Sequence, residues 1–376
     1  MKFLRKQLDA VRPQFEQGGR FEKLYYLYDA LDTFAFVPGH TTHGGVHIRD
    51  GVDLKRTMFI VVVALGPALL FGMWNVGHQH YVAIGEMTGL MEGLFDKLLY
   101  GSLITIPIVL VSYTAGGIVE VIFAIARKHS VQEGFLVSGM LIPLVMPPTV
   151  PLWMVALATV FAVVVAKEAF GGTGMNVLNV ALTARVFLFF AYPTYMAGDA
   201  VWVAGDPEQF VDGYSGATPL GVAYLEGLEG LKNAAFHDYS LLSMAIGTIP
   251  GSIGETSALM VLMGAGLLIA VNVADWRIIL SVLVGGFLTA GVLYAVNIDP
   301  FNGVPPHYHM VMGSILFAAV FMATDPVTAA STTMGKWIYG FLIGVFGIII
   351  RVLNPAYPEG WMLAILLMNV FAPTID

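Results

Sequence analysis

The chain has 376 residues, of which 57% are hydrophobic and only 12% are charged, and its mean hydropathy is +0.76. This composition excludes a string of soluble domains and indicates an integral membrane protein. The formal net charge of −8 argues against nucleic-acid binding. Cysteine is absent, so this chain offers no disulfide, no thiolate nucleophile and no cysteine ligand for an iron–sulfur cluster. A redox role would therefore need an organic cofactor.

The first 56 residues form a basic arm that holds nine of the eighteen Lys and Arg residues. By the positive-inside rule this arm is predicted to be cytoplasmic. Within it, apolar side chains at mixed spacings of three and four over residues 21–28 favour a short amphipathic helix at the membrane surface. A plain solvated arm explains the same pattern equally well.

Ten apolar segments follow, and they predict an all-α polytopic membrane protein with about ten transmembrane helices. The first half contains segments 57–76, 100–126, 135–147, 152–170 and 177–197, and the second half contains 257–273, 277–297, 309–323, 337–351 and 360–373. The run 240–250 is only moderately apolar and ends in Pro250-Gly251, so we predict that it does not span the membrane.

Charge asymmetry predicts the orientation of these helices. With the N-terminus inside, the basic side chains Arg127, Lys128, Lys167, Arg277 and Lys336 all fall on the cytoplasmic side. The long loop 198–256 carries eight acidic residues against the single base Lys232. This loop is therefore predicted to be extracytoplasmic.

A weak internal repeat relates the two halves. Residues 176–181 (Asn-Val-Leu-Asn-Val-Ala) resemble residues 351–356 (Arg-Val-Leu-Asn-Pro-Ala), and five helices separate the copies. The short segments 135–147 and 309–323 precede them, and at ~1.5 Å per residue a run of that length cannot cross a hydrocarbon core of ~30 Å. We predict two inverted five-helix repeats, 57–197 and 257–376, with a broken helix in each and a binding site between them. A gene duplication with a packed interior is the alternative.

The extracytoplasmic loop contains the run Asp212-Gly-Tyr-Ser-Gly-Ala-Thr218-Pro. Small residues before Thr218 leave its hydroxyl on an open backbone, which suits modification. Taken alone, the run reads as an ordinary turn, and its meaning depends on the rest of the chain.

With this context, the sequence resembles the B-type subunits of sodium-pumping NADH:quinone oxidoreductases, a branch of the B/D-type family of flavinylated membrane redox proteins. The resemblance rests on motifs along nearly the whole chain: residues 52–56 (VDLKR), 127–129 (RKH), 133–135 (EGF), 165–168 (VAKE), 170–174 (FGGTG), 187–193 (FLFFAYP), 215–218 (SGAT), 249–255 (IPGSIGE), 322–327 (MATDPV) and 354–360 (NPAYPEG). Two positions depart from the family pattern, because Val180 stands where the family has Pro and Met175 where it has a basic residue.

The resemblance implies FMN joined through its phosphate to Thr218, within the motif Ser215, Gly216, Ala217 and Thr218. It also implies a flavin transferase that attaches the FMN, a non-covalent riboflavin, ubiquinone as the electron acceptor and coupling to sodium export. The other members of a six-subunit complex in the bacterial inner membrane would supply NADH oxidation. Asp212 either orients the Thr218 hydroxyl during attachment or is a turn-forming residue.

Candidate residues for the remaining sites come from breaks in the helices, from the turn 133–135 and from carboxylates at helix ends. For riboflavin they are Asn176, Asn179, Arg185, Asp325 and Asn354, because a charge such as Arg185 inside an apolar helix indicates a functional site. Alternatively, Arg185 forms an ion pair with Glu168 or Asp325, and the asparagines cap helix ends. For quinone the candidates are His129, Glu133, Gly134 and Phe135. For sodium they are Asp29, Glu133, Asp325 and Asp376, and we assign no other metal ligand.

Two other functions compete with this interpretation. The homologous membrane protein of a ferredoxin:NAD oxidoreductase complex would also carry a flavin on threonine but would not reduce quinone. A channel or solute transporter built on the inverted repeat would carry no covalent flavin.

Overall fold

The computed structural model describes residues 2–16, 18–36, 44–46, 54–131, 134–297, 301, 303–354 and 360–376. Within these ranges all regular secondary structure is helical and no strand is present, which confirms the all-α class. Of the predicted site residues, Glu133 lies outside the described ranges.

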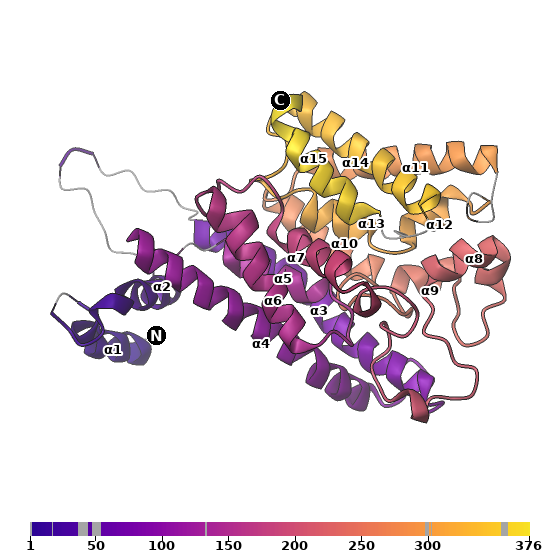
Figure 1. Ribbon diagram of the computed structural model, residues 1–376, viewed down its shortest axis with the longest axis horizontal. Helices are drawn as coiled ribbons and strands as arrows, with labels where there is room; N and C mark the ends of the chain where they lie inside the picture. Colours follow the sequence, from indigo (N-terminus) through magenta and orange to yellow (C-terminus); the bar gives the residue numbers. More distant parts are fainter. Residues whose placement is uncertain are drawn as a thin grey trace.

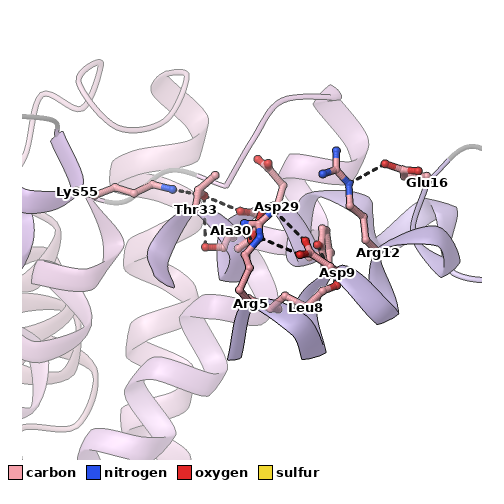
Figure 2. Close-up of polar contacts among 11 residues, drawn as sticks. Arg5, Leu8, Asp9, Arg12, Glu16, Asp29, Ala30, Thr33 and Lys55 are labelled. Atoms are coloured by element: carbon pink, nitrogen blue, oxygen red, sulfur yellow. Dashed lines mark hydrogen bonds and ion pairs between the residues drawn. The ribbon is translucent and has the colours of Figure 1, made fainter. Parts of the chain in front are cut away.

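The N-terminal arm folds into two helices that lie side by side at one end of the molecule (Figure 1). Its elements are α1 (Lys2–Val11), the 3₁₀ turns η1 (Arg12–Gln14) and η2 (Glu22–Leu24), and α2 (Tyr25–Ala35). Arg5 of α1 forms an ion pair with Asp32 of α2 at 2.9 Å. The Lys55 ammonium donates to the Thr33 hydroxyl of α2 (Figure 2). The arm is thus a helical pair tied to the start of the next helix, and its first helix was not predicted.

The first half of the apolar region begins with two long helices. Its elements are α3 (Leu54–Ala83), α4 (Leu94–Arg127), α5 (Phe135–Leu144), α6 (Leu152–Ala162), the π-helix η3 (Val163–Lys167), the 3₁₀ turn η4 (Glu168–Phe170) and α7 (Val180–Ala191). Helix α3 continues well past its predicted end at 76 because the polar side chains there find partners. Gln79 donates its amide to the Asn75 side chain at 3.1 Å, and the His80 ring contacts the carbonyl of Ala204 at 2.9 Å.

The loop between the halves contains a helix that the sequence analysis missed. Its elements are η5 (Pro193–Tyr195), η6 (Pro207–Gln209), α8 (Pro219–Lys232) and α9 (Leu241–Ile246). Helix α8 begins where it does because the Thr218 side chain caps its first turn and Pro219 takes the first helical position, which suits proline. Helix α9 has six residues, far too few to cross a membrane, as expected for the run 240–250.

The second half contains α10 (Ala258–Ala270), α11 (Trp276–Val296), α12 (Pro306–Val311), α13 (Ile315–Phe317), the π-helix η7 (Ala318–Met322), α14 (Thr333–Leu353) and α15 (Trp361–Ile375). The predicted segment 309–323 is therefore broken into three short pieces. The backbone turns at Gly313, whose φ of 68° lies in the left-handed region that favours glycine.

Five helical stretches in the described ranges are long and apolar enough to cross a membrane: Lys55–Ala83, Leu94–Arg127, Leu152–Phe170, Trp276–Val296 and Thr333–Leu353. Four shorter apolar helices accompany them: α5, α7, α10 and α15. This pattern supports a multi-pass membrane protein. All ten predicted segments contain helix, but the number of crossings stays a prediction.

The two halves pack against each other through two helix pairs. Within the halves the largest interfaces join α3 to α4, α11 to α14 and α14 to α15, while α3 contacts α10 and α7 contacts α15 across the divide. Helix α7 therefore lies between the halves, near the centre of the molecule in Figure 1.

Candidate functional site

The Ser-Gly-Ala-Thr motif leads directly into helix α8. The Thr218 hydroxyl accepts a hydrogen bond from the backbone N–H of Gly221 at 3.2 Å, so Thr218 is the N-cap of α8. The Ser215 hydroxyl donates to the Asp199 carboxylate at 3.2 Å. Gly216 is needed for a close approach, since a Cβ there would lie 2.7 Å from the Asp199 carbonyl oxygen. Asp199 thus holds the motif in place.

A cluster of aromatic rings supports the motif from behind. The Tyr239 hydroxyl donates to the carbonyl of Ala217. The His237 ring stacks on Tyr239 with centroids 5.7 Å apart and meets Tyr214 edge-on at 5.6 Å. Burial raises the pKa of both tyrosines and lowers the pKa of His237 to about 4, against which a hydrogen bond with the Ser215 backbone acts weakly. All three side chains are therefore neutral at pH 7.

The Thr218 side chain faces a cavity of about 290 Å³, which we call the Thr218 cavity. Its walls come from the end of α7, the segment 196–202, the start of α8, the segment 249–256 and the turn at Gly313. Flat apolar side chains (Phe189, Trp202, Tyr224) line it together with polar ones (Asp199, Ser252, Glu255). Asp212 is exposed and does not belong to this lining.

Arg185 does not line the Thr218 cavity, but it contacts two residues that do. Its guanidinium, only 2% exposed, donates to the Ser252 hydroxyl at 3.1 Å and to the Glu255 carboxylate at 3.2 Å. The alternative of an ion pair is confirmed, but the predicted partners are wrong: the carboxylate is that of Glu255, while Glu168 contacts Arg127 at 2.9 Å. Asp325 accepts hydrogen bonds from Val327 and Thr328. The loop 249–256 comes close enough to α7 to supply the carboxylate, which the spacing along the chain does not reveal.

A second cavity, of about 90 Å³, lies at the opposite end of α7, and we call it the Asn179 cavity. It is lined by Asn176, Asn179 and Asp325, three of the five residues predicted for riboflavin, and by Gly134 from the predicted quinone turn. Arg185 and Asn354 do not line it. Both π-helices contribute to its wall, η3 through Lys167 and η7 through Phe321. Such elements occur frequently at functional sites.

The polar groups around the Asn179 cavity are joined by hydrogen bonds. Asn179 caps α7 by accepting from the N–H of Leu182 at 3.1 Å, as the capping alternative predicted. The Asp325 carboxylate accepts from the N–H of Val327 and from the Thr328 hydroxyl, both at 3.1 Å. These contacts fix the two turns that face each other across the cavity.

Known proteins resemble this chain along almost its whole length. The sequence model described as the NQR2, RnfD, RnfE family matches residues 41–376. The chain belongs to this family. A relative from Chromohalobacter salexigens, named as the B-type subunit of Na(+)-translocating NADH-quinone reductase, is 46% identical over 392 residues, covering 99% of this chain and 93% of the relative. One of the same name from Stutzerimonas stutzeri is 46% identical over 394 residues, covering 99% and 96%.

The family membership confirms the resemblance that the motifs indicated. These relatives carry the name of one component of a multisubunit reductase. A third, from Ectopseudomonas mendocina, has the same name at 45% identity over 394 residues, with 99% of this chain and 96% of the relative covered.

The predicted quinone residues of this NQR2, RnfD, RnfE family member lie in different surroundings. Gly134 approaches the Thr173 side chain so closely that a Cβ would lie 2.5 Å from it. The Phe135 ring is buried at 6% exposure, meets Tyr113 edge-on at 6.1 Å and covers Gly116. His129 follows α4 and its ring contacts the carbonyl of Ser130 at 2.8 Å. Only Gly134 of these reaches the Asn179 cavity.

The sodium candidates in the described ranges lie apart from one another. Asp29 is in the arm on α2, where its carbonyl accepts from the Thr33 hydroxyl (Figure 2). Asp325 faces the Asn179 cavity. Asp376 accepts from the backbone N–H groups of Ser331 and Thr332 at 2.7 and 2.9 Å at the start of α14. Asn354, a riboflavin candidate, follows the far end of α14.

Three groups near the cavities were missed as site residues. Asn369 of α15, 1% exposed, accepts from the N–H of Asn179 at 3.2 Å and donates to the Thr328 carbonyl at 3.3 Å, so it bridges both turns of the Asn179 cavity. Lys167 forms a buried ion pair with Glu120 at 2.5 Å. The sequence contained a signal for Asn369 and Lys167, because a lone polar side chain in an apolar segment indicates a functional site. Asp199 gave no such signal, since it is one of eight acids in its loop.

Proposed function

We propose that this chain is the B-type subunit of a sodium-translocating NADH–quinone reductase, carrying electrons through covalent FMN and riboflavin to ubiquinone and coupled to sodium export. Membership of the NQR2, RnfD, RnfE family and 46% identity to relatives of that name support this assignment. The observation that carries it is the position of Thr218, whose hydroxyl lies at the mouth of a cavity and at the start of a helix.

The Thr218 cavity suits an FMN attached through phosphate. Its volume of about 290 Å³ is at the lower end of the ~300–1,000 Å³ range of ligand pockets. The N-terminus of α8 favours an anionic phosphodiester through its free N–H groups and helix dipole. Flat side chains such as Trp202 and Tyr224 offer packing surfaces for a planar ring system. The residues present therefore fit the group.

When bound, FMN supplies the one- and two-electron chemistry. The chain itself would anchor and orient the FMN. Thr218 would form the bond to the phosphate, and the Gly221 N–H lies 3.2 Å from the oxygen that would carry this bond. Asp199 fixes the backbone of the motif through Ser215. Glu255 lines the inner wall, and Arg185 behind it supplies a countercharge at 3.2 Å. A covalent bond keeps the group at a constant position without depending on affinity.

The Asn179 cavity fits less well. At about 90 Å³ it is much smaller than a usual ligand pocket and holds neither an isoalloxazine nor a whole quinone ring as it stands. Riboflavin and ubiquinone remain proposed cofactor and substrate, with Asn176, Asn179 and Asp325 as candidates for the former and Gly134 for the latter. We derive no step through either.

The proposal includes a topology of ten crossings in two inverted repeats with the N-terminus in the cytoplasm of a bacterium and the chain in its inner membrane. Five candidate spans and four shorter apolar helices support many crossings. The acidic loop with Thr218 would then face outward. A flavin transferase, the other subunits of the complex and sodium are the proposed partners, with Asp29, Asp325 and Asp376 as candidate sodium ligands.

In-gel fluorescence tests the assignment. The protein, produced with its native flavin transferase, should show flavin fluorescence after denaturation. Thr218→Val should abolish this signal, whereas Thr248→Val, the same change elsewhere in the loop, should leave it intact. A dark unmutated protein would rule out the flavinylated class and favour a channel or transporter.

Fluorescence that persists in Thr218→Val would move the attachment site to another residue. Quinone reduction by the complete complex then separates the proposal from the ferredoxin:NAD oxidoreductase alternative. A fluorescent protein whose complex oxidises NADH without reducing quinone would support that alternative.

A further inference from the structure

An apolar crevice of about 310 Å³ lies between α11 and α14, away from both cavities described above. Its walls are Val284 of α11 and Trp337, Ile338, Phe341 and Leu342 of α14, with Ser281 as its floor. Val284, Ile338 and Phe341 are each about two-fifths exposed, at 41%, 42% and 39%. On a membrane-spanning pair of helices, such a groove opens to the hydrocarbon region.

The crevice exists because the two helices approach closely beneath it. A Cβ at Gly340 would lie only 2.0 Å from the Ser281 hydroxyl oxygen, so α14 contributes no side chain at that level. The Ser281 hydroxyl is satisfied by donating to the carbonyl of Ile278 at 3.0 Å. The floor is therefore narrow and offers no free polar group, which suits a hydrocarbon chain.

Two cations stand at the end of the crevice where both helices begin. Arg277 precedes Ser281 by one helical turn, and Lys336 is next to Trp337 in the chain. Both contact a single carboxylate, Asp275, at 3.4 Å and 2.8 Å respectively. Their side chains are 36% and 26% exposed, so each can accept a further anionic partner.

The other acidic side chain at this end of the crevice, Asp376, is already hydrogen-bonded. Asp376 accepts hydrogen bonds from the Ser331 and Thr332 N–H groups and from the Thr332 hydroxyl at 2.7–2.9 Å. The two cations face the two carboxylates Asp275 and Asp376. The N-termini of α11 and α14 add about half a positive charge each, and the C-terminus of α15, which ends at Asp376, adds about half a negative charge. The local balance is therefore about half a positive charge.

Two tryptophan side chains lie beside the cations at this end of the crevice. Trp276 and Trp337 meet edge-on with centroids 5.8 Å apart, and the Arg277 guanidinium lies 5.5 Å from the centroid of the Trp276 ring. Tryptophan beside Lys and Arg is typical of the headgroup level of a membrane. Basic pockets between membrane helices bind anionic headgroups.

We propose that the α11–α14 crevice binds one anionic phospholipid, with an acyl chain against Val284 and Phe341 and its phosphate beside Arg277 and Lys336. The guanidinium can hold phosphate through two N–H groups, and the ammonium adds a point charge. With about half a net positive charge available, an anionic lipid is preferred over a zwitterionic one by about twofold.

Fluorescence quenching by lipids with brominated chains tests this site in the purified complex. The quenching that depends on Trp337 is the difference between the complex with the unmutated chain and that with Trp337→Phe. Half of this quenching should occur at about twofold lower mole fraction of phosphatidylglycerol than of phosphatidylcholine. Arg277→Gln combined with Lys336→Gln should remove this preference, whereas Lys232→Gln, an exposed cation on α8, should retain it.

A crevice-filling change provides a second test that does not alter charge. Val284→Phe, at an exposed position, should weaken Trp337 quenching by both lipids. Equal quenching by the two lipids in the unmutated protein would reduce the crevice to ordinary lipid contact and overturn the proposal. Absence of Trp337 quenching by either lipid would mean that another protein of the complex covers the crevice, which also overturns it.

Discussion

The Thr218 cavity and the Asn179 cavity lie at opposite ends of the same helix but are built in different ways. The Thr218 cavity surrounds a motif whose supports, Asp199, His237 and Tyr239, all come from one loop of the chain. The Asn179 cavity is assembled from α3, α5, α7, α10 and η7, and its turns are bridged by Asn369 from α15. The motif of the first cavity is thus supported locally, although α7 and the turn at Gly313 also line that cavity, whereas the turns of the second are held together by the packing of both halves.

Helix α7 sets the spacing between them. Asn179 caps its start at one cavity and Phe189 lines the other. The ten residues between them correspond to about 15 Å along a helix axis. A rigid helix thus holds the two cavities at a constant separation, which is what a pair of fixed electron carriers would need.

The largest expected effect on stability comes from breaking the buried ion pair beside the Asn179 cavity. Lys167 and Glu120 are each 3% exposed, with their charges 2.5 Å apart. Removing one charge leaves the other buried without its partner, so Lys167→Met or Glu120→Gln should cost about 3–5 kcal/mol. The apparent Tm of the purified complex should fall clearly for either change.

The double variant sharpens this prediction. Because the isolated buried charge causes the loss, Lys167→Met with Glu120→Gln should be more stable than either single variant. Lys232→Met on α8, whose ion pair with Glu229 is exposed, should change the stability by under about 1 kcal/mol. Equal small effects of Lys167→Met and Lys232→Met would contradict the view that the Asn179 cavity depends on buried packing.

Asn369 should give the next largest effect. Asn369→Leu removes the acceptor for the N–H of Asn179 and the donor to the Thr328 carbonyl and the Tyr339 hydroxyl. Leaving such groups buried and unpaired costs about 1–3 kcal/mol for each, so we expect a loss of about 3 kcal/mol in the free energy of unfolding.

Hydrogen exchange of the described turns on either side of the Asn179 cavity would report this loss directly. The N–H of Asn179 should exchange faster in Asn369→Leu, while the loop with Thr218 stays protected. Asn233→Leu, the same change at an exposed position after α8, serves as the control. Faster exchange in the Thr218 loop as well would mean that the two cavities are not independent structures.

The residues around the two cavities could be predicted from the sequence to different extents, and the reason is physical. The ten apolar segments, the motif before Thr218 and the short segment 135–147 follow from local composition and length. The turns with Asn179 and Asp325 were placed correctly beside helix breaks, but their union with Gly134 was not foreseen. These residues line one cavity because α5 packs against α7, and no local sequence pattern predicts that packing.

Arg185 illustrates the same limit. A buried arginine requires a carboxylate, and the sequence offered several acids at comparable plausibility. The partner, Glu255, lies seventy residues away in a loop whose path is fixed by contacts such as that between Asn75 and Ile249. Helix α8 was missed because three glycines interrupt its sequence and its start depends on the cap at Thr218.

The smallest expected effect concerns the Thr218 loop and its dependence on pH. Burial lowers the pKa of His237 to about 4 in the folded protein, whereas an unfolded histidine has a pKa of about 6.5. The unfolded chain therefore binds the proton first as pH falls. The stability from neutral His237 is complete above about pH 6.5 and is lost as pH falls from there towards 4. At pH 5 the loss is about 2 kcal/mol.

Limited proteolysis of the loop 198–256 at pH 7.5 and pH 5 measures this change. Cleavage should increase at pH 5, because protonating His237 between Tyr214 and Tyr239 loosens the cluster that supports Ala217. His237→Gln should make cleavage nearly independent of pH, whereas His307→Gln, an exposed histidine on α12, should behave as the unmutated protein does. A pH response that survives in His237→Gln would assign the titration to another group and would separate the motif from its aromatic support.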